Sequence, residues 1–332
     1  MKYKLLGRTG VKVSELCFGT MTFGNEADEA ESARMFGRCR DAGVNFFDCA
    51  NVYGDGRAEA ILGGLMASCR DELVITTKVT QRTGKGVNDF GSSRRNIMLE
   101  VEKSLRRLRT DRIDLYFIHH FDPNTPMEES IRALDDLVRQ GKVLYVGASN
   151  WSAWQTAKGL GISAARGLAR FECIEPMYNL VKRQAEVEIL PMAQSEGLGV
   201  IPYNPLGAGL LTGKYSRENK PDAGRLVEKE MYGKRYSDPA YYEAAERFVA
   251  YARSIGVNPV TLAIKWVQSH PAVTAPILGA RNLAQLEDSL AAADLDVGPE
   301  VLAQVSALSP APPTATDRLE EVLDPRYRAA NR

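Results

Sequence analysis

The sequence predicts an α/β fold: a single (β/α)8 barrel over residues 1–332, with an N-terminal β-hairpin cap and an extra helix and tail at the C-terminus. Segments with helical spacing alternate with strand-like segments along most of the chain. The strand-like segments number eight and are short and apolar, as parallel strands buried on both faces are. No linker divides the 332 residues, and eight such units favour a closed barrel over an open sheet.

The strands can be placed in order. Residues 3–7 and 11–20 are β-rich runs joined by the turn at 8–10, so we expect a hairpin that closes the bottom of the barrel. The second run also supplies the first barrel strand, which ends at Thr20. The other seven barrel strands are expected at 44–49, 72–79, 112–120, 142–150, 171–174, 198–204 and 272–279.

The helices carry conventional end signals. Gly43 and Gly141 follow two of them, and Pro126 stands at a favoured first position of another. The helix at 93–109 is amphipathic, with an apolar face made of Ile97, Leu99, Val101, Leu105 and Leu108. Helices are expected at 28–43, 57–70, 93–109, 125–141, 151–165, 182–196, 240–255, 259–269 and 282–294, and a last one at 299–309. A long irregular segment at 205–238 interrupts the alternation.

Composition argues against several classes of function. Lys plus Arg and Asp plus Glu number 42 each, and no basic run occurs, so a nucleic-acid partner is not expected. No apolar span has the length of a membrane helix, and the N-terminus has no apolar signal core. The five cysteines form no CxxC pair and only three histidines occur, so we expect neither a disulfide framework nor a metal site. These features predict a cytoplasmic protein, and they do not indicate its oligomeric state.

Polar residues end the predicted barrel strands, where the active sites of such barrels lie. They are Thr20, Asp48, Lys78, His119, Ser149 with Asn150, Glu175, Tyr203 with Asn204, and Gly279. Asp48 and Lys78 end neighbouring strands, so we expect a buried ion pair in which Asp48 keeps Lys78 cationic. Tyr53 follows Asp48 on a turn with Gly54 and Gly56, which can bring its phenol back over the pair. A nearby ammonium lowers the pKa of a phenol, and the set suits protonation of a carbonyl.

Several long segments resemble the aldo-keto reductase family. They are FFDCANVYGDGRAEAILG, TTKV, RRLRTDRIDLYFIHHFDPNTPMEESI, GKVLYVGASNW, YNPLGAGLLTGKY and ILGARNLAQLEDSL, and the likeness runs in register from about residue 3 to residue 309. The family implies reduction of aldehydes or ketones by NADPH, which is bound on the barrel without a Rossmann motif. It also implies a catalytic set of Asp48, Tyr53, Lys78 and His119, in which Tyr53 is the general acid and Lys78 lowers its pKa.

The same resemblance implies a site for NADPH or NADP⁺. Ser149 and Asn150 match the residues that hold the nicotinamide carboxamide, Tyr203 matches the aromatic that stacks on the ring, and Arg281 matches the 2′-phosphate site. Arg225 is a weaker candidate for that phosphate. The full set of implied contacts is Thr20, Met21, Asp48, Ser149, Asn150, Glu175, Tyr203, Asn204, Pro205, Leu206, Gly209, Leu211, Lys214, Arg225, Gly279, Ala280, Arg281, Gln285, Asp288 and Ser289.

Three positions of the implied cofactor site depart from the family pattern. Glu175 stands where most relatives have Gln, and an ionised Glu would only accept hydrogen bonds and would favour the positively charged NADP⁺. The pair Asp288 and Ser289 replaces a common Glu–Asn pair.

Alternative interpretations remain open at this stage. In isolation Asp48–Lys78 could be a structural ion pair, His119 and Tyr203 core residues, and Arg281 a solvated cation. The potassium-channel β-subunits of the same family suggest a cofactor-binding, redox-sensing regulatory subunit, although they carry Asn where this chain has His119. A Schiff-base aldolase on Lys78 is a third reading, which the charge on Lys78 opposes. The sequence predicts a small carbonyl substrate and an aromatic mouth from Phe23, Phe90, Phe121 and Trp151, but not the substrate itself.

Overall fold

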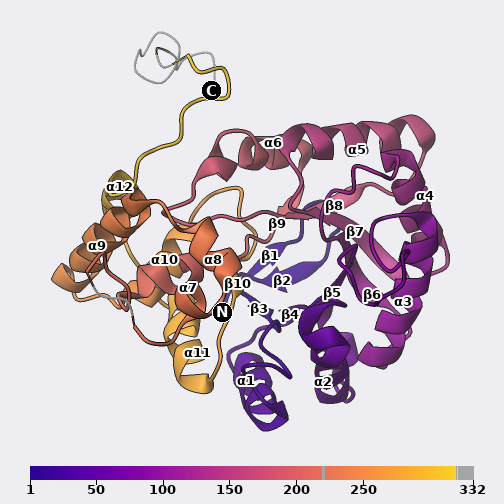
Figure 1. Cartoon of the computed structure of the whole chain (residues 1–332), viewed down its shortest axis with the longest axis horizontal. Coiled ribbons are helices and arrows are strands. Elements are labelled where there is room, and N and C mark those ends of the chain that lie inside the picture. Colours follow the sequence, from indigo (N-terminus) through magenta and orange to yellow (C-terminus); the bar gives the residue numbers. More distant parts are fainter. Residues whose placement is uncertain (219–220, 319, 321–332) are drawn as a thin grey trace.

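Eight parallel strands form the wall of a (β/α)8 barrel in the computed structural model, which describes residues 1–218, 221–318 and 320 (Figure 1). The order of the strands in the sheet follows the chain, with the last strand beside the first. They are β3 (Cys17–Gly19), β4 (Phe46–Asp48), β5 (Val74–Val79), β6 (Ile113–Ile118), β7 (Val143–Ser149), β8 (Phe171–Glu175), β9 (Gly199–Val200) and β10 (Ile277–Leu278).

The seam between β9 and β10 is closed by backbone hydrogen bonds just outside the regular strands. Thr274 N donates to Val200 O at 2.8 Å, and Ile277 N donates to Pro202 O at 2.9 Å. Since β10 also pairs with β3, the wall is continuous and the carboxyl ends of all the strands meet at one rim.

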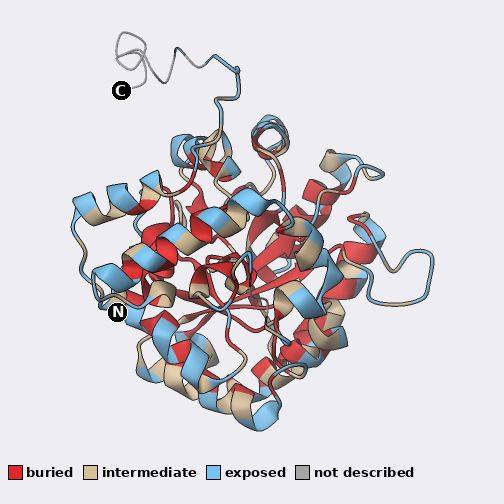
Figure 2. Cartoon of the chain, turned by 60° about the vertical axis from the view of Figure 1, so that its left-hand side comes forward, coloured by how far each residue is buried: buried red, intermediate tan, exposed pale blue. Residues whose placement is uncertain are grey.

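Helices surround this wall. The barrel helices are α1 (Glu29–Asp41), α2 (Arg57–Leu65), α3 (Arg94–Leu108), α4 (Met127–Arg139), α5 (Ala153–Arg166), α6 (Ile189–Glu196), α9 (Pro239–Ser254), α10 (Pro259–Gln268) and α11 (Leu283–Leu290). The short and terminal helices are η1 (Tyr53–Gly56), η2 (Arg70–Glu72), η3 (Gln184–Glu186), η4 (Gly207–Thr212), α7 (Arg225–Glu228), α8 (Glu230–Arg235), η5 (Ala291–Ala293) and α12 (Pro299–Ala307). Figure 2 shows the burial that results: the strands and the inward helix faces are buried, and the outward faces are exposed.

The N-terminal hairpin closes the bottom of the barrel, as predicted. Its strands, β1 (Tyr3–Leu5) and β2 (Lys12–Ser14), are antiparallel. Leu6 and Val13 are fully buried in the same apolar cluster as barrel-interior residues such as Phe117. Gly7 lies so close to the starts of β8 and β9 that a Cβ on it would stand 2.7 Å from Gly199 N, so the hairpin packs tightly against the barrel.

Local sequence explains several helix boundaries. A capping box formed by Ser152 and Gln155 begins α5, and Ser93 accepts a hydrogen bond from Asn96 N at the start of α3. The predicted helix at 182–196 begins only at Ile189, because Pro191 has no N–H and its ring would clash with a helical carbonyl at residue 187.

Three other expectations differ in detail. The run expected at 11–20 is divided between β2 and β3 by a bend at 15–16. The segment at 205–238, expected to be irregular, contains the short helices α7 and α8. Leu99, expected on the apolar face of its helix, faces solvent with 46% of its surface exposed. The described part of the tail leads away from the barrel in Figure 1, and residues 319 and 321–332 lie outside the described residues. None of the described helices combines the length and apolar character needed to cross a bilayer.

Candidate active site

Asp48 and Lys78 form a buried ion pair at the rim, as the sequence predicted. Lys78 is fully buried on β5, and its Nζ lies 2.6 Å from each carboxylate oxygen of Asp48, which ends β4. Lys78 Nζ also donates to Cys49 O at 3.0 Å. Burial alone would lower the pKa of Lys78, but Asp48 and then Glu175 raise it well above its ordinary value. The side chain is therefore a fixed cation, which argues against the aldolase interpretation.

Tyr53 lies beside this pair. Its hydroxyl is 3.4 Å from Lys78 Nζ, and η1, in which Gly54 and Gly56 have positive φ angles, carries it there. Burial raises the pKa of Tyr53 well above its ordinary value, and Lys78 acts in the opposite direction. The sequence predicted only the effect of Lys78. The effect of burial wins because Asp48 already balances the ammonium charge, so the phenol stays protonated at neutral pH.

His119 follows the end of β6 and faces Tyr53 edge to face, with 6.1 Å between ring centroids. It is 7% exposed, and burial, followed by the charge of Lys78, lowers its pKa well below the ordinary value. The imidazole is therefore neutral, with one donor and one acceptor nitrogen. His119 Nδ1 is buried without a hydrogen-bond partner among the described residues. The four residues of the predicted catalytic set thus lie together at one point of the rim.

The residues predicted to hold a carboxamide form a second group beside the first. Tyr203 donates its hydroxyl hydrogen bond to Asn150 Oδ1 at 2.7 Å, and Asn150 Nδ2 donates to His119 O at 3.0 Å and to Ser149 Oγ at 3.0 Å. Ser149 in turn donates to Glu175 O at 3.1 Å. Burial raises the pKa of Tyr203 to about 12. A continuous hydrogen-bonded chain therefore connects the ends of β6, β7, β8 and β9.

Glu175 points its carboxyl group toward Lys78, with Oε2 3.4 Å from Nζ. It is only 3% exposed, and Oε2 is without a hydrogen-bond partner within the described part of the chain. Burial and then Asp48 raise the pKa of Glu175 well above its ordinary value, and Lys78 only partly offsets them. The structure thus favours a protonated Glu175 where the sequence analysis expected an ionised one.

Residues that follow β3 make hydrogen bonds to the backbone of Asp48 and of Ala280. The backbone N and the Oγ1 of Thr20 donate to Asp48 O at 2.8 and 2.9 Å, and Thr22 Oγ1 donates to Ala280 O at 2.7 Å. Met21, between them, is half-buried. Thr20 therefore holds the backbone of the acid, and its hydroxyl is already engaged.

The loop at 204–214 curls over the rim as η4. Asn204, with a positive φ of 63°, accepts from Ala208 N at 2.6 Å through its side chain, and Leu206 O accepts from Gly209 N and Leu211 N. Pro205 and Leu211, which belong to this loop, are buried. Gly209 cannot carry a side chain easily, because its φ is 94° and a Cβ would lie 2.9 Å from Lys214 Cε.

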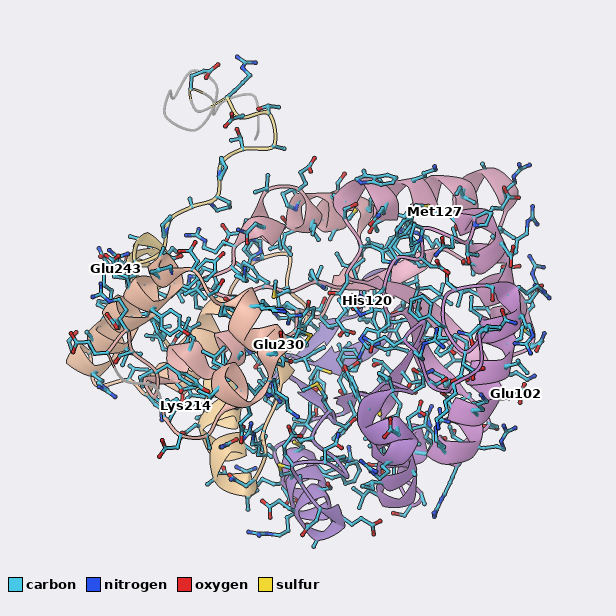
Figure 3. The ribbon with its side chains drawn as sticks, in the orientation of Figure 1. Glu102, His120, Met127, Lys214, Glu230 and Glu243 are labelled. Carbon is cyan, nitrogen blue, oxygen red and sulfur yellow. The ribbon has the colours of Figure 1, made fainter. Side chains whose placement is uncertain are left out.

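Three cations from separate segments form a basic cluster, which we define as Lys214, Arg225 and Arg281. Burial and then the positive charges of Arg281 and Arg225 lower the pKa of Lys214. The nearby acid is Glu228, whose Oε2 lies 3.2 Å from an Arg281 nitrogen. Figure 3 labels two residues of this part of the molecule, Lys214 of the cluster and Glu230 at the start of α8. The structure thus places Arg225, the weaker sequence candidate for the 2′-phosphate, near Lys214 together with Arg281, the stronger candidate.

The start of α11 carries the remaining predicted residues. Gly279 is exposed and Ala280 buried, and Gln285 Oε1 accepts from Arg281 N at 3.1 Å. The side chain of Asp288 is exposed two turns along. Ser289 is different: it is buried and donates its hydroxyl to Gln285 O at 3.2 Å, so it packs against its own helix.

Of the aromatic residues predicted to line the mouth, two pack together after the ends of β6 and β7. Phe121 packs edge to face on Trp151 at 5.2 Å and also contacts Trp154 at 6.3 Å, while Phe90 is 49% exposed under the guanidinium of Arg82. Phe23 does not belong to this wall, because it is fully buried against Phe18.

Sequence reasoning missed several residues of the site. Thr76 donates to Asp48 Oδ1 and lies on the same face of β5 as Lys78, so the two-residue strand period would have found it. Tyr236 accepts hydrogen bonds from Asn204 Nδ2 at 2.6 Å and Asn179 Nδ2 at 3.0 Å, and Trp154 is exposed at the mouth. Nothing in the sequence marks these two: Tyr236 follows α8 in the long segment before α9, and Trp154 lies in the first turn of α5.

Comparison with known proteins gives a consistent result. Residues 15–310 match the model of the aldo/keto reductase family. An uncharacterised oxidoreductase of Bacillus subtilis is 36% identical over 94% of this chain and 97% of its own length. A probable voltage-gated potassium channel subunit beta of rice is 37% identical over 96% and 99%. A norsolorinic acid reductase of Aspergillus flavus is 32% identical over 92% and 80%.

Proposed function

The chain belongs to the aldo/keto reductase family of carbonyl-reducing oxidoreductases, and from this premise we propose that it reduces an aldehyde or ketone to an alcohol with NADPH and with Tyr53 as the general acid. One observation carries the proposal. A phenol, an ammonium and a neutral imidazole from three successive strand ends converge within contact distance, and the ammonium is held by a buried carboxylate. This set can protonate a carbonyl oxygen and has no free nucleophile.

Tyr53 transfers its proton to the carbonyl oxygen, and Lys78 stabilises the phenolate that remains. Because burial keeps the phenol protonated, the donor is loaded across the neutral pH range, and the nearby ammonium lowers the free energy of its ionised form. Neutral His119 presents an N–H donor that can orient the same oxygen. A proton from solvent then restores Tyr53.

The rim fits a nicotinamide dinucleotide at both of its ends. At one end, Glu175 Oε2 and His119 Nδ1 are buried polar atoms without partners among the described residues, and Asn150 and Tyr203 lie beside them. At the other end, the basic cluster brings three cations together, an arrangement that an added phosphate group stabilises. When bound, the reduced nicotinamide supplies the hydride. The cluster is our reason for favouring NADPH over NADH.

A second candidate function is a cofactor-binding regulatory subunit with little turnover. The rice relative, and a probable channel subunit beta of Arabidopsis that is 38% identical over 89% of this chain, support it by their descriptions. His119 favours catalysis because it completes the set around the carbonyl oxygen.

A stopped-flow measurement distinguishes the two functions. The purified chain is loaded with NADPH and mixed with a panel of aliphatic and aromatic aldehydes and ketones. We expect oxidation of the bound cofactor to be faster than its release for at least one class of carbonyl. Oxidation slower than release across the whole panel would support the regulatory function instead.

A further inference from the structure

The buried centre of the site holds one cation and two acids. Lys78 is fully buried, Asp48 is 2% exposed and Glu175 is 3% exposed. An ammonium has three hydrogens to donate, and its close oxygens are those of Asp48 at 2.6 Å, Cys49 O at 3.0 Å and Tyr53 Oη at 3.4 Å. Glu175 Oε2, also at 3.4 Å, makes no hydrogen bond to the ammonium, so it has a buried oxygen that Lys78 does not satisfy.

Among the described residues, the charged groups that act on the Glu175 carboxyl are Asp48 and Lys78, with no second cation; Arg235 acts on Tyr203 and His120. Asp48 comes from β4, Lys78 from β5 and Tyr53 from η1, and the thiols of Cys17 and Cys173 and the phenol of Tyr203 complete the surroundings. Asp48 already neutralises Lys78, so an ionised Glu175 would be an uncompensated buried charge beside another carboxylate. Burial and Asp48 accordingly raise the pKa of Glu175. A protonated carboxyl group has one donor and one acceptor oxygen, like the side-chain amide of a glutamine.

Glu175 also stands at the residues that we propose hold the nicotinamide. Its backbone oxygen accepts from Ser149 Oγ at 3.1 Å and from Asn150 N at 3.3 Å, and Ser149 is its partner across β7 and β8. Asn150 connects to Tyr203 through a hydrogen bond of 2.7 Å. A group bound on these residues lies next to the Glu175 carboxyl, and a change in that group's charge therefore acts on the carboxyl proton.

We propose that Glu175 selects the oxidation state of the cofactor by changing its own protonation: it keeps its proton beside the neutral reduced ring and releases it to solvent when the positively charged oxidised ring binds. The inference rests on the proposed cofactor site. The step is balanced, because the protonated chain plus free NADP⁺ gives the ionised chain with bound NADP⁺ plus one proton. No bond other than the O–H bond of Glu175 breaks.

The proposal determines how the affinity for each dinucleotide changes with pH. A ligand that lowers the pKa of a group releases protons on binding and binds more tightly as pH rises between the free and bound values of that pKa. For one proton, the dissociation constant of NADP⁺ falls by up to about tenfold per pH unit in that window. The dissociation constant of NADPH has no such component, so the preference for the oxidised form increases with pH.

Isothermal titration calorimetry in two buffers of equal pH and different ionisation enthalpy counts the protons that the chain releases or takes up when a dinucleotide binds. NADP⁺ and NADPH are each titrated into the wild-type chain, Glu175→Gln and Glu172→Gln. Glu172 is a half-buried glutamate near the opposite end of β8, so it is the matched control. Both dinucleotides carry the same 2′-phosphate, so its protons cancel in the difference between them.

We expect wild type and Glu172→Gln to release up to one proton more with NADP⁺ than with NADPH, and Glu175→Gln to bind both dinucleotides with no difference in proton count. Equal counts for the two dinucleotides in wild type would overturn the inference, as would an unchanged difference in Glu175→Gln. These outcomes leave the proposed function intact. Failure of wild type to bind either dinucleotide would overturn the proposed function and this inference together.

Discussion

The two ends of the proposed cofactor site are built in opposite ways. At the catalytic end, Lys78 is fully buried and its Nζ lies 2.6 Å from the Asp48 carboxylate, so its charge is balanced by the fold itself. At the phosphate end, Lys214, Arg225 and Arg281 come from three segments, and burial and the charges of the two arginines lower the pKa of Lys214. The charge of Lys78 at the first end is balanced without a ligand, whereas the positive charges of the second end are balanced by an added anion. We infer that the catalytic end determines the chemistry and the basic cluster determines which dinucleotide binds.

Tyr53→Phe tests the catalytic end most severely. The change removes the proton donor and leaves the ring and the Asp48–Lys78 pair in place, so carbonyl reduction should fall by about 10²- to 10⁴-fold. NADPH binding, measured by fluorescence titration, should change little because the basic cluster is untouched. Turnover measured by NADPH absorbance that stays near the wild-type rate would contradict the role of Tyr53.

Lys78→Met tests whether the same end is also a structural element. Removal of the cation leaves Asp48 and Glu175 buried without a positive partner, which should cost about 3–5 kcal/mol in the free energy of unfolding. Urea unfolding measures this loss, with Lys158→Met on the exposed side of α5 as the control.

The loss in Lys78→Met should shrink as pH falls. Without the ammonium, the ionised acids are buried with no cation beside them, so protonation favours the folded variant and the penalty grows as pH rises. A loss that is independent of pH would show that lost packing, and not unpaired charge, destabilises the variant.

The residues of the catalytic end could be predicted from the sequence because the positions at which the strands end could be predicted. Asp48, Lys78 and His119 each close a short apolar run, and alternation along a strand tells which side chains share a face. Protonation was not predictable, since the state of Tyr53 and Glu175 depends on burial, which only the assembled fold provides. The segment at 205–238 was equally hidden, because α7 and α8 are short helices without long apolar periods.

Arg281→Ala tests the phosphate end. A charge-assisted hydrogen bond contributes about 1.5–3 kcal/mol, so NADPH affinity should fall roughly 10- to 100-fold while NADH affinity changes little. Loss of Arg281 also frees Glu228, now 3.2 Å from it, to repel the phosphate. Dissociation constants for both dinucleotides measure the effect, and Arg132→Ala on α4 is the control. An equal loss for NADH and NADPH would show that Arg281 does not read the 2′-phosphate.

Added salt should weaken binding at the phosphate end and leave the chemical step at the catalytic end nearly unchanged. This is the smallest of the expected effects. The cations of the cluster are partly exposed, and the Debye length falls from about 10 Å at 0.1 M salt to about 3 Å at 1 M, so NADPH affinity should fall several-fold over this range. The single-turnover rate at saturating NADPH should stay nearly constant, because the charges around Lys78 are buried and already balanced. Arg281→Ala should show a weaker salt dependence of binding than wild type. If salt slowed the single-turnover step as strongly as it weakened binding, the catalytic end would be open to solvent ions, and the contrast between the two ends would fail.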